Sequence, residues 1–86
     1  MKLSQLTKKK VHIIGINGIG MSALAVYLKK NKIDVSGSDI AKNSNTDVLN
    51  RNGINVIIGH KEENIKNKDI IFYSSAIKNN PEIKAA

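Results

Sequence analysis

The sequence contains no cysteine and no tryptophan, and it has only one proline, one phenylalanine and two tyrosines in 86 residues. Without cysteine, the chain has neither a disulfide framework nor a thiolate that binds a metal or attacks a substrate. With so few aromatic side chains, the core must consist of isoleucine, valine, leucine and alanine. Strands built from these residues are typical of a parallel sheet that helices cover.

Acidic residues are also few: 7 stand against 14 lysines and arginines, so the net charge is +7. A basic surface attracts polyanions such as nucleic acid. The lysines are nevertheless scattered, apart from clusters at residues 8–10 and 29–32, and few aromatic rings are available to stack on bases. We therefore expect no nucleic-acid partner.

Long apolar runs are absent as well. No run approaches the ~20 residues that cross a bilayer. The basic residues 1–10 lack the apolar stretch of a signal peptide. We expect a soluble, cytoplasmic protein with no membrane partner.

The sequence does contain one dense glycine motif. A β-branched apolar run at residues 11–14 stops at Gly15, and Gly18 and Gly20 follow before a helical apolar period begins. This order predicts a strand, a tight turn and the start of a helix. Unpaired amides and the positive end of the helix dipole then point to a place where a phosphate can sit. The motif therefore predicts a nucleotide diphosphate as ligand, although a turn that binds no ligand is an alternative.

The three glycines have different expected roles. Gly15 lets the strand turn sharply, Gly18 removes a Cβ where a pyrophosphate approaches, and Gly20 lets the helix pack closely on its strand. Asn17 stands where the dinucleotide pattern G-x-G-x-x-G has its middle glycine. Because asparagine tolerates a left-handed backbone, we expect the turn to form with Asn17 in place.

The remaining elements follow from periodicity and turn residues. We expect helices at residues 18–30 and 45–52, a helical turn at 61–66, and strands at 11–15, 34–38, 54–58 and 69–73. This order predicts an α/β, Rossmann-like three-layer sandwich whose parallel sheet has four strands in the order 3-2-1-4. The chain is one domain, residues 1–86.

Particular residues are expected to end these elements. Asn31 takes a left-handed conformation after the first helix, and Ser44 caps the second helix with Asp47 reaching back. His12, the one polar residue of the first strand, touches the helical layer. Residues 80–82 begin a helix that the sequence does not complete, which indicates a fragment of a larger protein.

Polar residues follow the strands at the edge where such sheets bind ligands. Asp39 comes 19 residues after Gly20, the distance at which a carboxylate accepts hydrogen bonds from a ribose or base. His60 follows the third strand, and Ser74 and Ser75 follow the fourth, where hydroxyls bond phosphate or ribose oxygens. A solvated acid, a loop histidine and turn-capping serines are the alternatives. We expect no catalytic residue and no metal ligand in the chain.

Four blocks of sequence occur in a characteristic order: GINGIGMSALA at 15–25, VSGSD at 35–39, INVIIGH at 54–60 and IIFYSSAIKNNPEI at 70–83. Together they resemble the amino-terminal domain of the Mur ligases, above all the members that join L-alanine to UDP-N-acetylmuramate. The resemblance runs from about residue 12 to the last residue. Many members carry glycine where Asn17 stands, and residues 77–81 are one residue shorter than usual.

The resemblance implies a binding domain for the UDP part of UDP-N-acetylmuramate. Residues 18–22 would hold the diphosphate, Ser38 and Asp39 would lie near the uridine with His60, and residues 74–76 would lie beside the ribose and phosphates. The predicted site residues are Gly15, Asn17, Gly18, Ile19, Gly20, Met21, Ser22, Ser38, Asp39, His60, Ser74, Ser75 and Ala76.

The resemblance also implies that ATP and magnesium act in the remaining domains of a larger ligase. The chain lacks the ATP-binding pattern G-x-x-x-x-G-K-[ST], so it should bind substrate without catalysis and without either cofactor. Two alternatives stay open. An NAD-binding regulatory or dehydrogenase domain explains the glycines but gives the SSAIKNNPE block no role. A sister ligase that recycles a murein peptide would share this domain's task.

Overall fold

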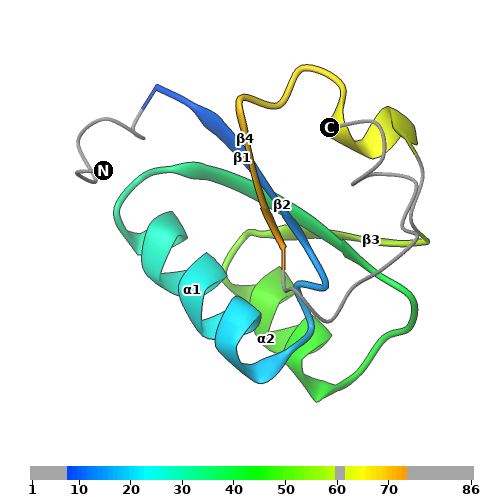
Figure 1. Cartoon of the computed structure of the whole chain (residues 1–86). Coiled ribbons are helices and arrows are strands. Elements are labelled where there is room, and N and C mark those ends of the chain that lie inside the picture. Colours follow the sequence, from blue (N-terminus) through cyan, green and yellow to red (C-terminus); the bar gives the residue numbers. More distant parts are fainter. Residues whose placement is uncertain (1–7, 60–61, 74–86) are drawn as a thin grey trace.

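The computed structural model describes residues 8–59 and 62–73 of the chain (Figure 1). In chain order, the elements of this part are β1 (Lys10–Ile14), α1 (Ile19–Lys30), β2 (Asp34–Asp39), α2 (Ser44–Arg51), β3 (Asn55–Ile58), the short 3-10 helix η2 (Glu62–Ile65) and β4 (Ile70–Tyr73). Each predicted strand and helix is present, with bounds that differ by one or two residues. The helix start predicted at residues 80–82 lies outside the described residues.

The four strands form one parallel sheet in the order β3-β2-β1-β4, which confirms the predicted strand order and the Rossmann-like α/β class. The connections from β1 to β2 and from β2 to β3 run in the same direction. Their helices, α1 and α2, accordingly lie side by side on one face of the sheet (Figure 1). The connection from β3 to β4 runs the opposite way, so a right-handed crossover carries η2 on the other face.

The core lies between the sheet and the two helices. Alternate residues of β1 and β2 point toward α1 and α2, as expected for strands with a period of two. The buried apolar side chains of this cluster are Val11, Ile13, Ile16, Ala25, Leu28, Ile33, Val35, Leu49 and Ile54. Tyr27, which the sequence places off the apolar stripe of α1, is 55% exposed.

His12 lies on the face of the sheet away from α1 and α2, so the predicted contact with a helical layer is not made to these two helices. Val11 and Ile13, its neighbours in β1, face the helices, and strand alternation turns His12 the other way. Its ring is fully buried, with Nδ1 3.1 Å from Ser36 Oγ and Nε2 3.2 Å from Ser38 Oγ. The two ring nitrogens of His12 thus contact two serines of β2 on the face of the sheet away from α1 and α2.

The start of α2 also differs from the prediction. Asn43, and not Ser44, is the N-cap: Asn43 Oδ1 accepts a hydrogen bond from the N–H of Asn45 (2.9 Å). Thr46 Oγ1 accepts from the N–H of Asn43 (3.0 Å), in the role expected of Asp47. Asparagine caps a helix as well as serine does, so the sequence alone leaves the position uncertain by one residue.

The end of α1 is corrected in the same way. Lys32 (φ 64°) is the left-handed residue, and Asn31 has φ −94°. Asn31 Nδ2 donates to the carbonyl of Tyr27 (2.8 Å), which satisfies a terminal helix carbonyl from a nearly helical backbone. The left-handed stop therefore moves one residue further along the chain. Lys29 and Lys30 occupy the last turn, as predicted.

Candidate nucleotide-binding site

The turn from β1 to α1 is held against the end of β2. Gly15 has φ 80°, a conformation that side chains rarely adopt, so this position requires glycine for the sharp turn that the sequence predicts. The N–H groups of Gly15 and Ile16 both donate to the carbonyl of Ser38 (2.8 and 3.1 Å). The N–H of Gly18 then donates back to the carbonyl of Gly15 (3.1 Å). The turn is therefore fixed before α1 begins.

The N-terminus of α1 is open. Gly18 is its N-cap, with extended backbone and no side-chain cap, and the first turn contains no acidic residue. The first helical hydrogen bond runs from the N–H of Ser22 to the carbonyl of Gly18 (2.8 Å). In the described part of the chain, the amides of Ile19, Gly20 and Met21 have no acceptor. Three donors and the positive end of the helix dipole thus remain available to an anion.

No side chain of the described residues covers this corner. Gly18 and Gly20 are exposed, and Ile19 is 87% exposed. A Cβ added to Gly20 would meet no atom within 4 Å, so its predicted role in close helix–strand packing is wrong. Residue 20, in the first turn of α1, is exposed. The empty space beside the amides is what a diphosphate needs in order to approach.

Gly37 makes the close approach that was assigned to Gly20. A Cβ at this position in β2 would lie 2.6 Å from Ile16 Cβ and 2.9 Å from the Ile13 carbonyl, and closer still to Ile16 Cδ1. The turn therefore packs directly on the backbone of β2. A lone glycine inside the VSGSD strand is the sequence signal for such a contact.

Asp39 lies at the predicted edge but is bonded to the turn. Its Oδ2 accepts the N–H of Asn17 (2.9 Å) and its Oδ1 accepts the N–H of Ile40 (2.8 Å). The left-handed backbone expected for Asn17 is absent, since Asn17 does not have positive φ. Hydrogen bonds, rather than an unusual backbone, hold Asn17 in the turn. A role of Asp39 toward a ribose or base stays a prediction.

The other predicted site residues have different positions. Ser38 is fully buried: its carbonyl holds the turn and its Oγ contacts His12, so it supports the corner without lining it. The Ser22 hydroxyl donates to the carbonyl of Ile19 (3.0 Å). His60 and residues 74–76 lie outside the described residues. Among the residues that are described, no group of three or more histidines, aspartates or glutamates is placed to hold a metal ion.

Basic side chains gather at the opposite edge of the sheet, where the strands begin. The basic residues at this end of the sheet are Lys8, Lys9 and Lys10 before and in β1, Lys29, Lys30 and Lys32 before β2, Arg51 before β3, and Lys66 and Lys68 before β4. A strand of five or six residues is about 17–20 Å long, and the Debye length at physiological salt is about 8 Å. These lysines are therefore screened from the corner.

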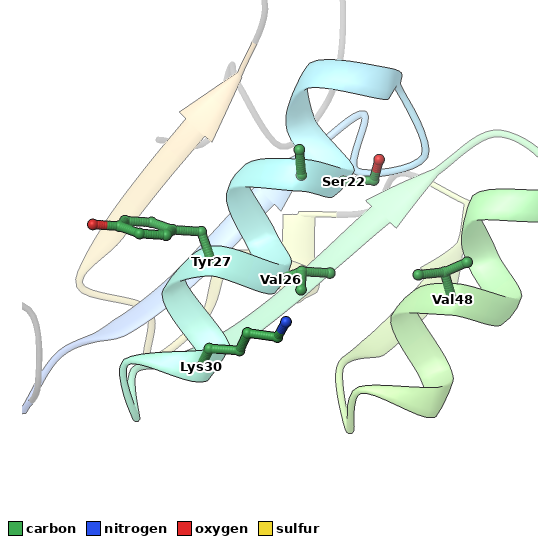
Figure 2. Close-up of a pocket in the computed structure, with 6 residues that line it drawn as sticks. Ser22, Val26, Tyr27, Lys30 and Val48 are labelled. Carbon is green, nitrogen blue, oxygen red and sulfur yellow. The ribbon is translucent and has the colours of Figure 1, made fainter.

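A groove with a volume of about 420 Å³ lies between α1 and α2. Val26 of α1 and Val48 of α2 face each other across it, and Lys30 lies at one end (Figure 2). Of the predicted site residues that the structure describes, only Ser22 lines this groove. Its walls are helix side chains rather than open backbone amides, so it does not have the chemistry of a phosphate site.

The sequence matches a known protein family. Residues 10–86 match the sequence model described as "Mur ligase family, catalytic domain". The chain belongs to the Mur ligase family. It is 49% identical over 79 residues to the UDP-N-acetylmuramate–L-alanine ligase of Aquifex aeolicus, and 46% identical over 87 residues to that of a Wolbachia species from Brugia malayi. These alignments cover 91% and 100% of this Mur ligase chain, but 17% and 16% of the relatives.

Two solved structures share the fold. The UDP-N-acetylmuramate-alanine ligase of Thermotoga maritima superimposes with a TM-score of 0.82 at 38% identity, over 88% of this chain and 18% of that one. The UDP-N-acetylmuramate:L-alanyl-gamma-D-glutamyl-meso-diaminopimelate ligase of Neisseria meningitides gives 0.81 at 28% identity, over 90% and 25%. This Mur ligase chain thus spans less than a fifth of the curated relatives described above. None of its described helices is long and apolar enough to cross a membrane.

Proposed function

We propose that this chain is the amino-terminal substrate-binding domain of an ATP-dependent UDP-N-acetylmuramate:L-alanine ligase of peptidoglycan synthesis. In this proposal it holds the UDP part of UDP-N-acetylmuramate in the cytoplasm. The observation that carries the proposal is the open N-terminus of α1, where the amides of Ile19, Gly20 and Met21 lack an acceptor within the described part of the chain. The relatives at 46–49% identity support the L-alanine ligase assignment.

The diphosphate is bound by backbone groups. Its oxygens accept hydrogen bonds from the amides of Ile19, Gly20 and Met21, and the helix dipole adds a favourable term. Gly15 and Gly18 shape the turn that aims these amides. In this proposal Asp39 and His60 lie toward the uridine, and residues 74–76 complete the ribose and phosphate contacts.

The chemical step belongs to the remaining domains of the ligase. ATP and magnesium bound there supply the phosphoryl group and the charge neutralisation that activate the muramoyl carboxylate for attack by L-alanine. The residues of this chain bind and orient the nucleotide end of the substrate. We assign none of them a catalytic role, so the chain alone binds UDP-N-acetylmuramate without turnover.

The two alternatives differ in how well they fit. A ligase that attaches a recycled peptide to the same UDP-sugar would use this site identically. The relative with a peptide substrate in its name is 28% identical, against 46–49% for the L-alanine ligases, which favours the latter. A dinucleotide-binding domain would use the same glycine turn. The relatives and solved structures described above have a UDP-sugar in their names, which favours UDP over NAD.

Parallel titrations of the chain with UDP and NADH test the proposal. Three charge-assisted hydrogen bonds contribute about 1.5–3 kcal/mol each, and association costs at least about 4 kcal/mol. The upper half of this range leaves about 3 to 5 kcal/mol, which predicts a Kd for UDP between a few millimolar and a few hundred micromolar. We expect NADH to bind at least about tenfold more weakly. Tighter binding of NADH than of UDP would identify a dinucleotide domain instead, and no binding of UDP at about 10 mM would overturn the proposal.

A further inference from the structure

Asn17 is bonded to the 39–45 segment, the residues that lead from the end of β2 into α2, through its backbone and its side chain. Its N–H donates to Asp39 Oδ2 (2.9 Å) and its Nδ2 donates to the carbonyl of Ala41 (2.7 Å). Its carbonyl accepts from Nδ2 of Asn43 (3.1 Å) and of Asn45 (2.9 Å). Four hydrogen bonds of a single residue therefore join the β1–α1 turn to this segment.

Packing alone does not explain an asparagine at this position. Asn17 is 3% exposed, and its Oδ1 is buried with no hydrogen-bond partner in the described part of the chain. A buried polar atom without a partner lowers stability, so a small or apolar residue would suit the fold better. The backbone of Asn17 has no positive φ that would favour asparagine. What the carboxamide does supply is the hydrogen bond from Nδ2 to Ala41.

This hydrogen bond lies close to the open amides. Only Gly18 separates Asn17 from Ile19, the first residue of α1, so the place of residue 17 sets the place of the three donors. At the other end of the network, Asn43 is the N-cap of α2. The network thus connects the uncapped N-terminus of α1 to the capped N-terminus of α2.

We propose that Asn17 is a positioning residue of the nucleotide site. Its carboxamide fixes the amides of Ile19, Gly20 and Met21 against the 39–45 segment, so that binding of a nucleoside diphosphate and ordering of this segment are coupled. The inference rests on the proposed function, because it assigns a role at the same site. Donors held in place before binding lose less freedom when the ligand arrives, which raises affinity. Coupling is reciprocal, so the nucleotide must also stabilise the 39–45 segment.

Amide NMR titrations of the 86-residue chain with UDP test this inference. In the wild type, we expect UDP to shift the amides of Ile40 and Asn45, whose acceptors belong to the network, together with those of residues 19–21. In Asn17→Ala, we expect a Kd about threefold to tenfold higher, the range for one hydrogen bond. At saturation, residues 19–21 should still respond fully, whereas the shifts of Ile40 and Asn45 should be clearly smaller than in the wild type, because one of the four bonds to residue 17 is gone.

Two further variants make the result specific. Asn45→Ala removes only the bond from Asn45 Nδ2 to the carbonyl of Asn17, and we expect a Kd about twofold to threefold higher. Ile33→Val, which trims a buried side chain where β2 begins, lowers stability away from the turn. We expect it to leave the Kd unchanged. If Asn17→Ala does not fold, Asn17→Ser, which also lacks the Nδ2 donor to the carbonyl of Ala41, takes its place.

The possible results separate the two proposals. If UDP binds the wild type and both asparagine variants with one Kd, Asn17 has no positioning role and the proposed function stands. If UDP does not bind the wild type, the proposed function is overturned and the positioning role with it. A raised Kd in Ile33→Val equal to that in Asn17→Ala would also contradict the inference, because any loss of stability would then suffice.

Discussion

Replacing Gly37 by alanine is expected to lower the free energy of unfolding by about 2 to 3 kcal/mol, the cost of forcing extra atoms into a packed core. The new Cβ would lie 2.6 Å from Ile16 Cβ and 2.9 Å from the carbonyl of Ile13. Ile16 has little freedom to move away, because it is fully buried and its N–H is bonded to the carbonyl of Ser38. For a chain of this size the midpoint of thermal unfolding should fall by roughly 10–20 °C.

Gly20→Ala is the matched control for this substitution. A Cβ at Gly20 meets no atom within 4 Å, and alanine favours the helix that contains it. We therefore expect its midpoint to stay the same or to rise by a few degrees. Thermal denaturation followed by circular dichroism compares the two variants. Equal midpoints would contradict the packing of the turn on β2.

Replacing Asp39 by alanine is expected to have the second large effect. Two backbone amides, of Asn17 and Ile40, would lose their acceptors, and hydrogen bonds to a charged group contribute about 1.5–3 kcal/mol. We expect a loss of about 2 kcal/mol in the free energy of unfolding, since Asp39 is partly exposed and water replaces some of the interaction. The Kd for UDP should rise about tenfold or more, because the turn that aims the amides is released.

Two variants control for the charge of Asp39. Asp39→Asn keeps one acceptor oxygen, so it should recover part of both losses. Asp34→Ala removes an exposed carboxylate at the start of the same strand and should change neither the stability nor the Kd. Urea denaturation and UDP titration of all three variants measure these effects. If Asp39→Ala binds UDP as the wild type does, the carboxylate does not hold the site.

The elements of the fold were predictable because they depend on local pattern. Runs of isoleucine and valine, the helical period after Gly20 and the turn residues between them are visible over windows of a few residues. The strand order followed from right-handed connections together with the position of the glycine motif after the first strand. These rules need no knowledge of which side chains touch.

The details of the corner depend on contacts between residues far apart in sequence. Asn17 bonds to the 39–45 segment across 22 to 28 positions, and Gly37 is needed because Ile16 lies over it. The shift of the cap from Ser44 to Asn43 has a related cause, since Asn43 also donates to the carbonyl of Asn17. Local propensity favours both residues equally, and only the tertiary contact decides between them.

In the proposed function, binding of UDP depends on the three open amides at the start of α1. Amide NMR spectra recorded during a UDP titration test them most directly, since each amide gives its own signal. We predict that the largest shifts occur at Ile19, Gly20 and Met21, with smaller shifts in the 39–45 segment. If saturating UDP leaves these three signals in place and moves those of the groove between α1 and α2 instead, the nucleotide site has been assigned to the wrong part of the molecule.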